Sequence, residues 1–479
     1  MKHYITSLLL LLSVFLLNPL YAYADNYQTS VSCAYSHTLG DDAILMFGMP
    51  GHAMWHDFFG NQKTDAYSTY VTLRENAGTT CDTLADSSAY WSPAMRLPNQ
   101  QIAPPKYAKV YYQTVNSTQY PLTSLPEGLQ LLAGNHTGTT KNPYISFFCN
   151  DGTGYSNTDQ RTCQRASDGT LQVDIGIRFP NCWDGHTLKA KPSGSPAKPN
   201  AVYSNDDGSC PIDYPKHIPT INMNVAYIIN GYDKLDLTQV QLSLDPIMNG
   251  DQRIEQWGTM YTAHGDFING WSPDATKFMT ERCMNNNYDC TGHMPYSYSD
   301  SSADTYVSNL TDSDKNFGSQ PQMLALGDIS NSSALNNPMK IALVKYKIPP
   351  MPTQYPADQT ALFSYKLRLS GSILTTPAKA ITLYAYPAST NWDEASVTWN
   401  NRPTCDVTSW SSLYLDNAVS YRELDVTTLV QKALQKGQTE IAFCIAGDSK
   451  TSGYTYGFST KETPYLSQLR VVATQPSNE

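Results

Sequence analysis

Residues 222–229 read Asn222-Met-Asn-Val-Ala-Tyr-Ile-Ile229, a run that first alternates polar and apolar side chains and then becomes wholly apolar. Alternation is typical of a half-buried β-strand, and a short apolar run is typical of a buried one. Gly, Pro, Asn and Asp clusters separate similar runs at residues 108–112, 144–148 and 171–177. One helix is predicted at Pro273–Met284, with Ser272 as its cap. We therefore expect a β-rich N-terminal part with few helices.

The C-terminal third repeats this pattern. Strands are predicted at residues 341–347, 362–369, 380–386 and 440–445. One amphipathic helix is predicted at Val426–Gln435, with Leu429, Val430 and Leu434 on one face and Gly437 as its stop. Many short strands with one helix indicate a β-sandwich or jelly roll. The predicted fold class is therefore mostly β, with a β-rich N-terminal domain and a C-terminal β-sandwich or jelly-roll module.

The first residues have the pattern of a secretory signal peptide. Lys2 and His3 precede a leucine-rich apolar run that ends at Leu17, and Ala22-Tyr23-Ala24 is a small-x-small cleavage pattern. A membrane anchor is the alternative, but the run is shorter than the ~20 residues that a bilayer requires. We expect a signal peptide over residues 1–24, no membrane span, and a secreted protein that is extracellular or periplasmic.

Length and charge limit the remaining classes. A chain of 479 residues is too long for one ordinary domain, and the polar, turn-like stretch at 296–302 predicts domains over residues 25–298 and 303–474. No histidine follows His293, so chemistry that needs imidazole belongs to the first domain. The net charge of −10 argues against nucleic acid as a partner. An acidic polysaccharide would need a local basic cleft, which the sequence does not indicate.

Ten cysteines, an even number, predict disulfides in an exported protein. None of them has the Cys-x-x-Cys spacing of a zinc ribbon or a redox site. Cys283 and Cys290 are close enough to close a small loop, and Cys405 and Cys444 are alone in the last third and should pair with each other. The other pairings stay open.

Three stretches of the C-terminal part resemble DNRLRE-type carbohydrate-binding modules, a family with alginate-binding members. They are Asp304–Val307 with 316–319, 392–394 with Val397-Thr-Trp-Asn-Asn-Arg-Pro403, and 425–427 with Phe458–Glu462. The resemblance covers about 170 residues and implies a jelly-roll module that binds carbohydrate. Trp392, Trp399 and Asn400 are better explained as core and turn residues that define that fold.

The N-terminal part resembles an uncharacterised family of secreted proteins, a domain of unknown function that often occurs beside sugar-binding domains. The motifs that carry the resemblance are His56-Asp-Phe-Phe-Gly-Asn61, Phe179-Pro-Asn-Cys-Trp-Asp-Gly185 and His264-Gly-Asp-Phe-Ile-Asn-Gly-Trp271. The family often has His-x-His before Phe-Phe-Gly, whereas Met54 occupies the first position of that pair here. This protein therefore lacks part of the family's pattern, unless His52 replaces it. The resemblance implies no particular reaction.

The candidate catalytic residues are His56, Asp57, Asp184, His264 and Asp266. A histidine beside a carboxylate can act as an oriented general base, and Gly265 would let the backbone turn sharply between them. If His56, Asp184, His264 and Asp266 converge, their two carboxylates and two imidazoles could cleave a glycosidic bond or bind a divalent metal. A local hydrogen bond would explain His56, and an Asp-Gly turn would explain Asp184, equally well.

Trp91, Trp183 and Trp257 are the candidate substrate-binding residues, because aromatic faces stack on sugar rings, although buried tryptophans are common. The leading hypothesis is a secreted carbohydrate-active protein that binds, and could cleave, a polysaccharide or glycoconjugate. One alternative is a non-catalytic secreted adhesin. The other is a metal-dependent hydrolase of a non-sugar substrate such as a phosphoester. The sequence does not indicate an oligomeric state.

Overall fold

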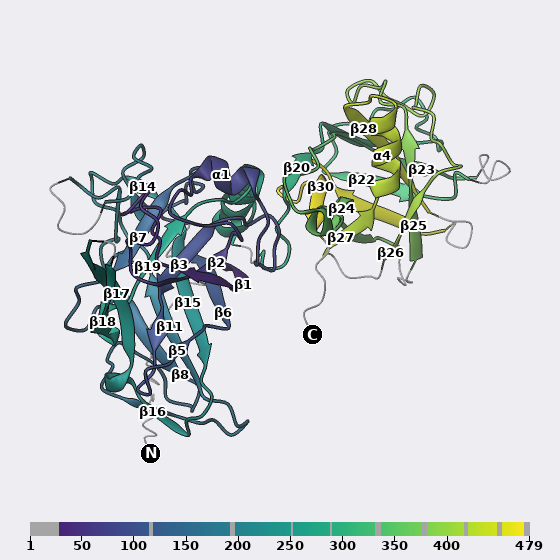
Figure 1. Cartoon of the computed structure of the whole chain (residues 1–479). Coiled ribbons are helices and arrows are strands. Elements are labelled where there is room, and N and C mark those ends of the chain that lie inside the picture. The colour runs from purple at the N-terminus through teal and green to yellow at the C-terminus, as the bar shows by residue number, and fades with distance from the viewer. Residues whose placement is uncertain are drawn as a thin grey trace, which may run out of the picture.

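The computed structural model describes residues 28–114, 118–191, 197–250, 252–287, 290–330, 337–375, 381–415, 420–447 and 453–473. The predicted signal peptide, residues 1–24, lies outside these ranges. Strands make up 41% and helices 9% of the chain, which confirms the mostly β prediction. Two lobes are visible in Figure 1, each built around one antiparallel sheet.

The N-terminal lobe contains a ten-stranded antiparallel sheet. In order across the sheet, the strands are β7 (Gln130–Gly134), β19 (His264–Ile268), β3 (Ala89–Pro93), β2 (His56–Gly60), β1 (Gln28–Leu39), β6 (Tyr107–Gln113), β15 (Thr220–Ile228), β11 (Gln172–Arg178), β8 (Ile145–Cys149) and β9 (Gly154–Ser156). The predicted strands at 108–112, 144–148, 171–177 and 222–229 correspond to β6, β8, β11 and β15.

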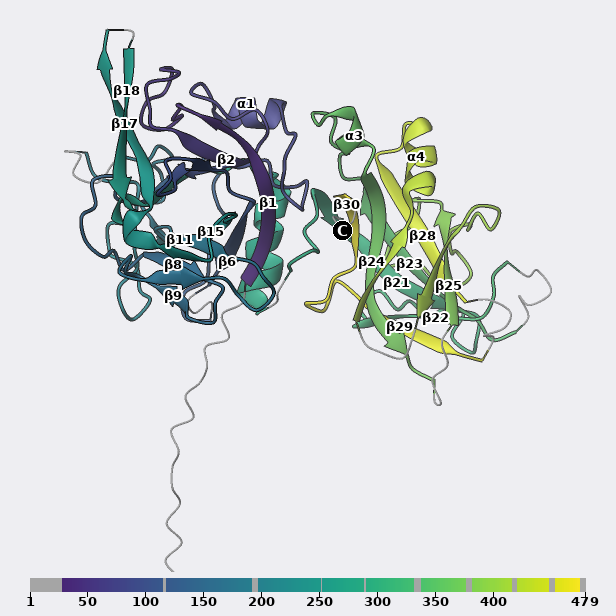
Figure 2. The ribbon, with the colours of Figure 1, turned by 60° about the horizontal axis from the view of Figure 1, so that its bottom comes forward.

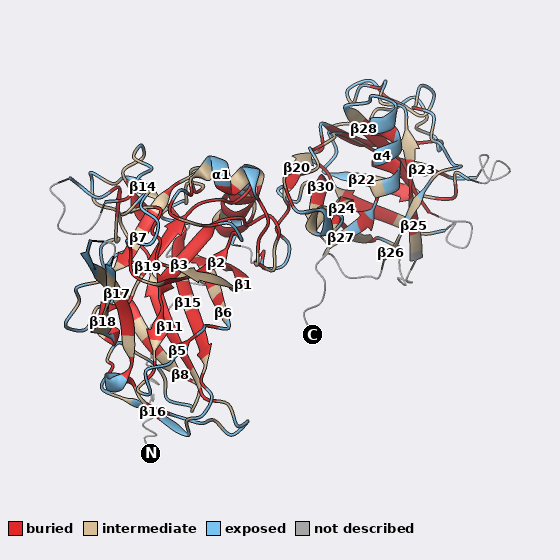
Figure 3. Cartoon of the chain, in the orientation of Figure 1, coloured by how far each residue is buried: buried red, intermediate tan, exposed pale blue. Residues whose placement is uncertain are grey.

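Strand β1 is the reason that this sheet can curl. Its first half pairs with β6 and its second half with β2, and the register shifts between Tyr35 and His37. A register shift of this kind bends a strand and increases its twist. The sheet curls strongly into a half-barrel, which Figure 2 shows with β1 running along one side. Figure 3 shows that its strands are largely buried.

Smaller elements surround this sheet. The short strands are β10 (Thr162–Gln164) with β16 (Lys234–Asp236), β13 (Ala201–Val202) with β12 (Cys182–Trp183) and β14 (Lys216–His217), and β18 (Gln252–Thr259) with β17 (Gln241–Asn249), β4 (Met95–Arg96) and β5 (Ile102–Ala103). The helical segments are α1 (Tyr70–Glu75), α2 (Pro273–Lys277), a π-helical turn (Phe278–Cys283) and 3-10 turns at Leu237–Gln239, Met260–Thr262 and Met284–Asn286.

The helix predicted from Pro273 is present, but its geometry changes along its length. The Ser272 hydroxyl accepts a hydrogen bond from the backbone N–H of Ala275, as the cap prediction requires. The segment is α-helical only to Lys277 and then continues through the π-helical and 3-10 turns to Asn286.

The C-terminal lobe contains one curled antiparallel sheet of eleven strands. Along its main path these are β20 (Ser297–Asp300), β30 (Gln468–Ala473), β24 (Phe363–Ile373), β29 (Thr455–Ser459), β22 (Gln322–Leu326), β23 (Lys340–Lys347), β28 (Glu440–Ala446), β25 (Ile381–Ala388) and β26 (Ser411–Leu415), and off it are β21 (Ala303–Ser308) beside β23 and β27 (Ser420–Asp425) beside β24. The helices are α3 (Ala357–Thr360) and α4 (Thr427–Gln435). Helix α4 confirms the predicted amphipathic helix, but its buried residues are Leu429, Val430 and Ala433, whereas Leu434, predicted on the same face, is exposed.

Five disulfides cross-link the described residues, and none of the ten cysteines is free. The pairs Cys283–Cys290 and Cys405–Cys444 confirm the two predicted bridges. The three that the sequence left open are Cys33–Cys81, Cys149–Cys163 and Cys182–Cys210. This usage is consistent with an extracellular protein.

The two lobes contact each other through the loop after β23 and helix α3. The Tyr355 hydroxyl donates to the carbonyl oxygen of Leu84, and the Gln359 amide exchanges two hydrogen bonds, of 2.9 and 3.2 Å, with the backbone of Thr79. Ala77 and Leu84 of the N-terminal lobe belong to the core of the C-terminal lobe. Across the described residues, no helix is both long and apolar enough to cross a membrane.

Candidate functional site

Three adjacent strands, β2, β3 and β19, bring His56, His264 and Asp266 together. His56 pairs with Pro93 of β3, and Asp266 pairs with Trp91 of the same strand. Because β19 and β3 are antiparallel, the residue two positions before Asp266, which is His264, lies opposite the residue two positions after Trp91, which is Pro93. Since side chains alternate along a strand, His264 and Asp266 share one face of β19. The two histidines therefore flank the compact side chain of Pro93, above which their rings can approach.

The polar atoms of the three side chains converge. One ligand atom from each of His56, His264 and Asp266 lies within 4.8 Å of the other two. The imidazole rings of His56 and His264 are edge to face, with 5.8 Å between centroids. A third ring, that of His136 in the loop after β7, lies 6.2 Å from His264. We call His56, His264 and Asp266 the His-His-Asp cluster.

Hydrogen bonds to backbone carbonyls determine which ring nitrogen of His56 and of His264 carries the proton. Nδ1 of His56 lies 2.9 Å from the carbonyl oxygen of Asp41, and Nδ1 of His264 lies 2.8 Å from that of Thr262. A carbonyl only accepts, so each Nδ1 carries the proton and donates it. Each Nε2 of a neutral ring then presents a lone pair to the cluster. Burial lowers the pKa of both His56 and His264 to about 4, so both rings are neutral at pH 7.

Asp266 is buried without a hydrogen bond. Its side chain is 2% exposed, and no described residue donates to its carboxyl group. Burial, together with the nearby carboxyl groups of Asp42 and Asp245, raises the pKa of Asp266 well above its ordinary value. The Nε2 of His56 is also buried and unpaired. Such groups are rare in folded proteins and are typical of functional sites.

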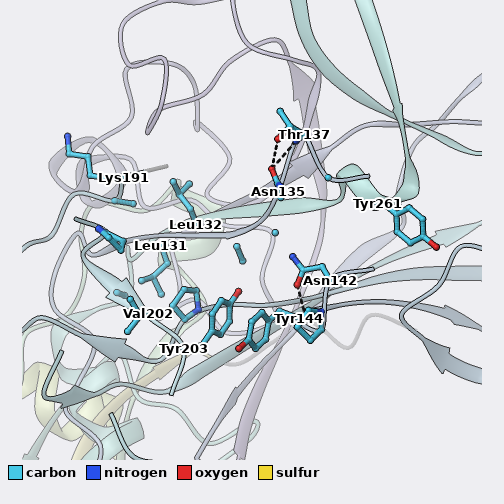
Figure 4. A pocket seen from close by; sticks show the side chains of 18 of the residues that line it. Leu131, Leu132, Asn135, Thr137, Asn142, Tyr144, Lys191, Val202, Tyr203 and Tyr261 are labelled. Carbon is cyan, nitrogen blue, oxygen red and sulfur yellow. Dashed lines mark hydrogen bonds between the residues drawn. The ribbon is translucent and has the colours of Figure 1, made fainter. Parts of the chain in front are cut away.

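A cavity of about 90 Å³ opens beside the cluster and is lined by His136, His264 and Asp266. It shares residues 132–135 and Thr137 with a larger pocket of about 610 Å³. Figure 4 shows this pocket, with Tyr261 and Lys191 on opposite sides of it. The two cavities are thus neighbours along β7 and the loop that follows it.

The larger pocket is lined by aromatic and amide groups. Tyr144 and Tyr203 stack with 3.4 Å between ring centroids, and Asn135 and Asn142 also face the pocket (Figure 4). Its charged lining residues are Lys141 and Lys191, and no Asp or Glu is among the described residues that line it. The structure thus gathers a local basic surface that the sequence did not indicate.

Asp57 and Asp184 do not join the cluster. Asp57 follows His56 on β2 and therefore points to the opposite face, where Thr38 donates to it at 2.6 Å and burial raises its pKa to about 7. The carboxylate of Asp184 accepts the backbone N–H groups of His186 and Thr187 at 2.9 and 2.8 Å. Asp184 thus closes a local turn, which matches the alternative explanation of its Asp-Gly motif.

The three candidate tryptophans have different surroundings. Trp91 is fully buried and packs on Phe58 at 5.6 Å, so it cannot stack on a ligand. Trp183 is 8% exposed, and its indole N–H donates to the Thr187 carbonyl. Trp257 is half-buried, with the Arg96 guanidinium 4.2 Å from its ring. All three are engaged within the protein.

The structure contradicts the expected roles of His52 and Gly265. His52 is exposed, and its Nδ1 contacts the Pro50 carbonyl, so it does not replace the histidine that Met54 displaces. Strand β19 runs straight through Gly265, so the sharp turn expected there is wrong. A Cβ atom at this position would lie 2.9 Å from the Cε atom of Met223, so the end of that side chain would have to shift to admit one.

The C-terminal lobe has an exposed aromatic row that sequence reasoning missed. Trp410, immediately before β26, and Tyr414 in β26 are 54% and 68% exposed. Tyr384 of β25 lies on the same face and meets Trp410 edge to face at 5.1 Å. Strand β26 ends the main path of the sheet, so this face lies at its edge. We call Tyr384, Trp410 and Tyr414 the aromatic row.

Comparison with protein families assigns both lobes. Residues 295–474 match Carbohydrate-binding module family 96, and residues 42–271 match Domain of unknown function (DUF1996). The chain joins a DUF1996 domain to a family 96 carbohydrate-binding module. No curated protein matches it. The His-His-Asp cluster thus belongs to the DUF1996 domain, and the aromatic row belongs to the carbohydrate-binding module.

The motif residues of the family 96 module meet at one point. The Lys461 ammonium pairs with Glu394, the Glu394 carboxylate accepts the backbone N–H of Asp304, and the Asp304 carboxylate accepts the backbone N–H of Lys461. Asn316 donates to the carbonyl oxygens of Glu394 and Val397. These contacts tie together segments far apart in the sequence, so they stabilise the fold of the module.

Proposed function

We propose that the protein is a secreted carbohydrate-active protein whose family 96 module holds a polysaccharide while its DUF1996 domain acts on that polymer. The observation that carries the binding part is the aromatic row, on a module that matches a carbohydrate-binding family. Exposed aromatic side chains cost free energy in water and offer flat apolar faces. Sugar rings have apolar faces of the same kind, on which the row can stack.

The geometry of the row suits an extended chain. Trp410 and Tyr414 are four residues apart in an extended segment, so they lie on one face about 13 Å apart at ~3.3 Å per residue. Tyr384, on the neighbouring strand β25, pairs with Ser412 and therefore lies between them on the same face. A line of aromatic groups with this spacing can contact successive sugar units of one polymer.

The pocket beside the His-His-Asp cluster supports action on the same polymer. Its tyrosines and amides can hold sugar rings and hydroxyl groups, and Lys141 and Lys191 make it compatible with acidic sugars. Tethering to the module would raise the local concentration of polymer at this pocket. Cleavage at the cluster, by hydrolysis or elimination, is the reaction that we propose.

A glycan array with the full secreted chain, including neutral and acidic polysaccharides, tests the binding part. Trp410→Ala and Tyr414→Ala should each weaken binding of the best ligand by about 2 kcal/mol, roughly thirtyfold, as truncation of a central aromatic anchor does. Tyr67→Ala is the control, because Tyr67 is 53% exposed but lies on the DUF1996 domain. Equal binding by all variants would place the ligand elsewhere, and no binding to any glycan would contradict the proposal.

A non-catalytic adhesin is the second candidate, favoured by the observation that residues 295–474, which match the carbohydrate-binding module, contain no histidine. It predicts binding without release of reducing ends, unchanged in His56→Ala and His264→Ala. Release from the wild type that disappears in His264→Ala would reject it.

A further inference from the structure

We propose that His56, His264 and Asp266 form a binding site for a divalent first-row transition-metal ion, with Zn²⁺ as the best match. The inference goes beyond carbohydrate binding and does not depend on it. It rests on the arrangement of donor atoms, on two buried polar atoms that lack partners, and on the charges around the cluster.

The donor atoms have the types and orientation that zinc requires. Two neutral imidazoles present Nε2, a carboxylate completes the set, and the atoms lie within 4.8 Å of one another. Zinc binds these groups at ~2.0–2.2 Å, so ligands around one ion are ~3–4 Å apart. Both rings donate Nδ1–H to a backbone carbonyl, that of Asp41 or that of Thr262, which is the second-shell contact that orients metal-bound histidines.

The unpaired atoms are the independent sign of a ligand. Asp266 is 2% exposed and His56 is 1% exposed, yet Oδ2 of Asp266 and Nε2 of His56 have no hydrogen-bond partner among the described residues. Leaving a buried polar group unpaired costs about 1–3 kcal/mol, and more for a charged one. Since the ligand atoms of these residues lie within 4.8 Å of one another, one cation between them would satisfy both groups.

The surrounding charges favour a cation over an anion or a neutral ligand. Three further carboxyl groups, those of Asp41, Asp42 and Asp245, act electrostatically on His56, His264 or Asp266. Arg253 is the cation that opposes them, and its guanidinium is paired with Glu255 at 2.7 Å. The cluster therefore lies in a negative environment.

The donor set also selects among metals. Mg²⁺ and Ca²⁺ prefer oxygen ligands, whereas two imidazole nitrogens with one carboxylate suit Zn²⁺ and its neighbours in the transition series. Three protein ligands leave a fourth position open, as in catalytic rather than structural zinc sites. That position faces the 90 Å³ cavity, where His136 lies near His264.

Other groupings of potential ligands lack these features. Cys182–Cys210 and Cys33–Cys81 are disulfides, whose sulfur atoms are not available as thiolates. In the grouping of Asp304, Glu394 and Glu462, the Asp304 carboxylate already accepts the backbone N–H of Lys461, and the Glu394 carboxylate is paired with the Lys461 ammonium group. Of these groupings among the described residues, only the His-His-Asp cluster has two buried members, His56 and Asp266, whose polar atoms lack partners.

The test is a metal titration of the full secreted chain after dialysis against a chelator. We expect elemental analysis to find one zinc ion per chain after reloading with Zn²⁺. Cobalt(II) in its place should give the visible absorption of a site with nitrogen and oxygen ligands. His264→Ala and Asp266→Asn should weaken zinc binding by at least about a hundredfold, since loss even of outer-shell contacts costs about 10–100-fold.

His52→Ala is the matched control, because His52 is an exposed histidine outside the cluster. It should bind zinc as the wild type does. Failure of the wild type to bind zinc or cobalt stoichiometrically, or equal zinc affinity in His264→Ala, would overturn the site. The cobalt spectrum of the wild type decides the question even if a variant fails to fold. None of these measurements uses a glycan, so their failure is distinct from failure of carbohydrate binding.

Discussion

Asp266 should destabilise the metal-free protein. Its carboxyl group is 2% exposed and receives no hydrogen bond from the described residues, so folding removes it from water without compensation. Asp266→Asn keeps the shape and removes the charge. Because burial raises the pKa of Asp266, keeping its carboxyl group charged or protonating it at pH 8 costs free energy that a neutral amide does not. We therefore expect the metal-free variant to be more stable than the wild type by about 1–3 kcal/mol.

A second buried carboxyl group in the same domain provides the control. Asp41 is 6% exposed, and its two oxygens accept the backbone N–H groups of Gly51 at 2.8 Å and Ala66 at 3.1 Å. Asp41→Asn places an NH₂ group against one of these donors and loses a charge-assisted hydrogen bond. It should therefore destabilise the protein by about 1.5–3 kcal/mol, opposite in sign to Asp266→Asn.

The assay is urea unfolding of the metal-free protein at pH 8 with its disulfides intact, followed by tryptophan fluorescence. With zinc present at about 1,000 times its dissociation constant, the wild type should gain about 4.1 kcal/mol and Asp266→Asn should gain little. The order of stability would thus reverse on adding metal. If Asp266→Asn destabilises the metal-free protein as much as Asp41→Asn does, Asp266 has a partner and the reasoning is refuted.

Three further predictions concern stability. Trp271→Phe removes the 2.8 Å hydrogen bond from the indole N–H to the Tyr112 hydroxyl in the core, and urea unfolding should show a loss of at least about 1–3 kcal/mol; no change would mean that this contact is unimportant. Replacing Cys405 and Cys444 together by Ser opens a loop of 39 residues and should cost about 4 kcal/mol, mainly as a lower melting temperature of the carbohydrate-binding module; an unchanged transition would contradict this. Burial raises the pKa of Asp86 to about 6, against about 4 when unfolded, so its stabilising contribution is complete below about pH 4 and is lost as the pH rises through about 6. The stability of the wild type relative to Asp86→Asn should therefore fall from pH 4 to pH 6, and a difference that is flat with pH would show that the pKa is not raised.

Most strands could be predicted from the sequence because alternation is a local property. The runs at 108–112 and 222–229 lie within β6 and β15, and the helix from Thr427 follows from its own apolar spacing. Cys405 and Cys444 could be paired because no other cysteine lies in the last third. The order of strands across each sheet could not be predicted, because it depends on contacts between residues far apart in the chain.

The same limit applies to the candidate site. Alternation alone places His264 and Asp266 on one face, and it places Asp57 opposite His56, which the sequence argument did not use. Strand β3 lies between β2 and β19, with Pro93 opposite His56. This order depends on contacts between segments far apart in the chain, so alternation within one strand could not predict it.

Two groups of functional candidates were missed for similar reasons. His136 comes near the cluster because β7 pairs Gly134 with His264. The aromatic row had a local signal, since Trp410 and Tyr414 are an even number of residues apart, but the strand that contains Tyr414 was not predicted.

The most direct test of the central claim is release of reducing ends from the polysaccharide that binds best, measured with the full chain and His264→Ala. We predict that the wild type releases reducing ends, that His264→Ala releases none while binding the polymer equally, and that Trp410→Ala loses release in proportion to its loss of binding. Binding by the wild type without any release would contradict the claim that the DUF1996 domain cleaves the polymer held by the module.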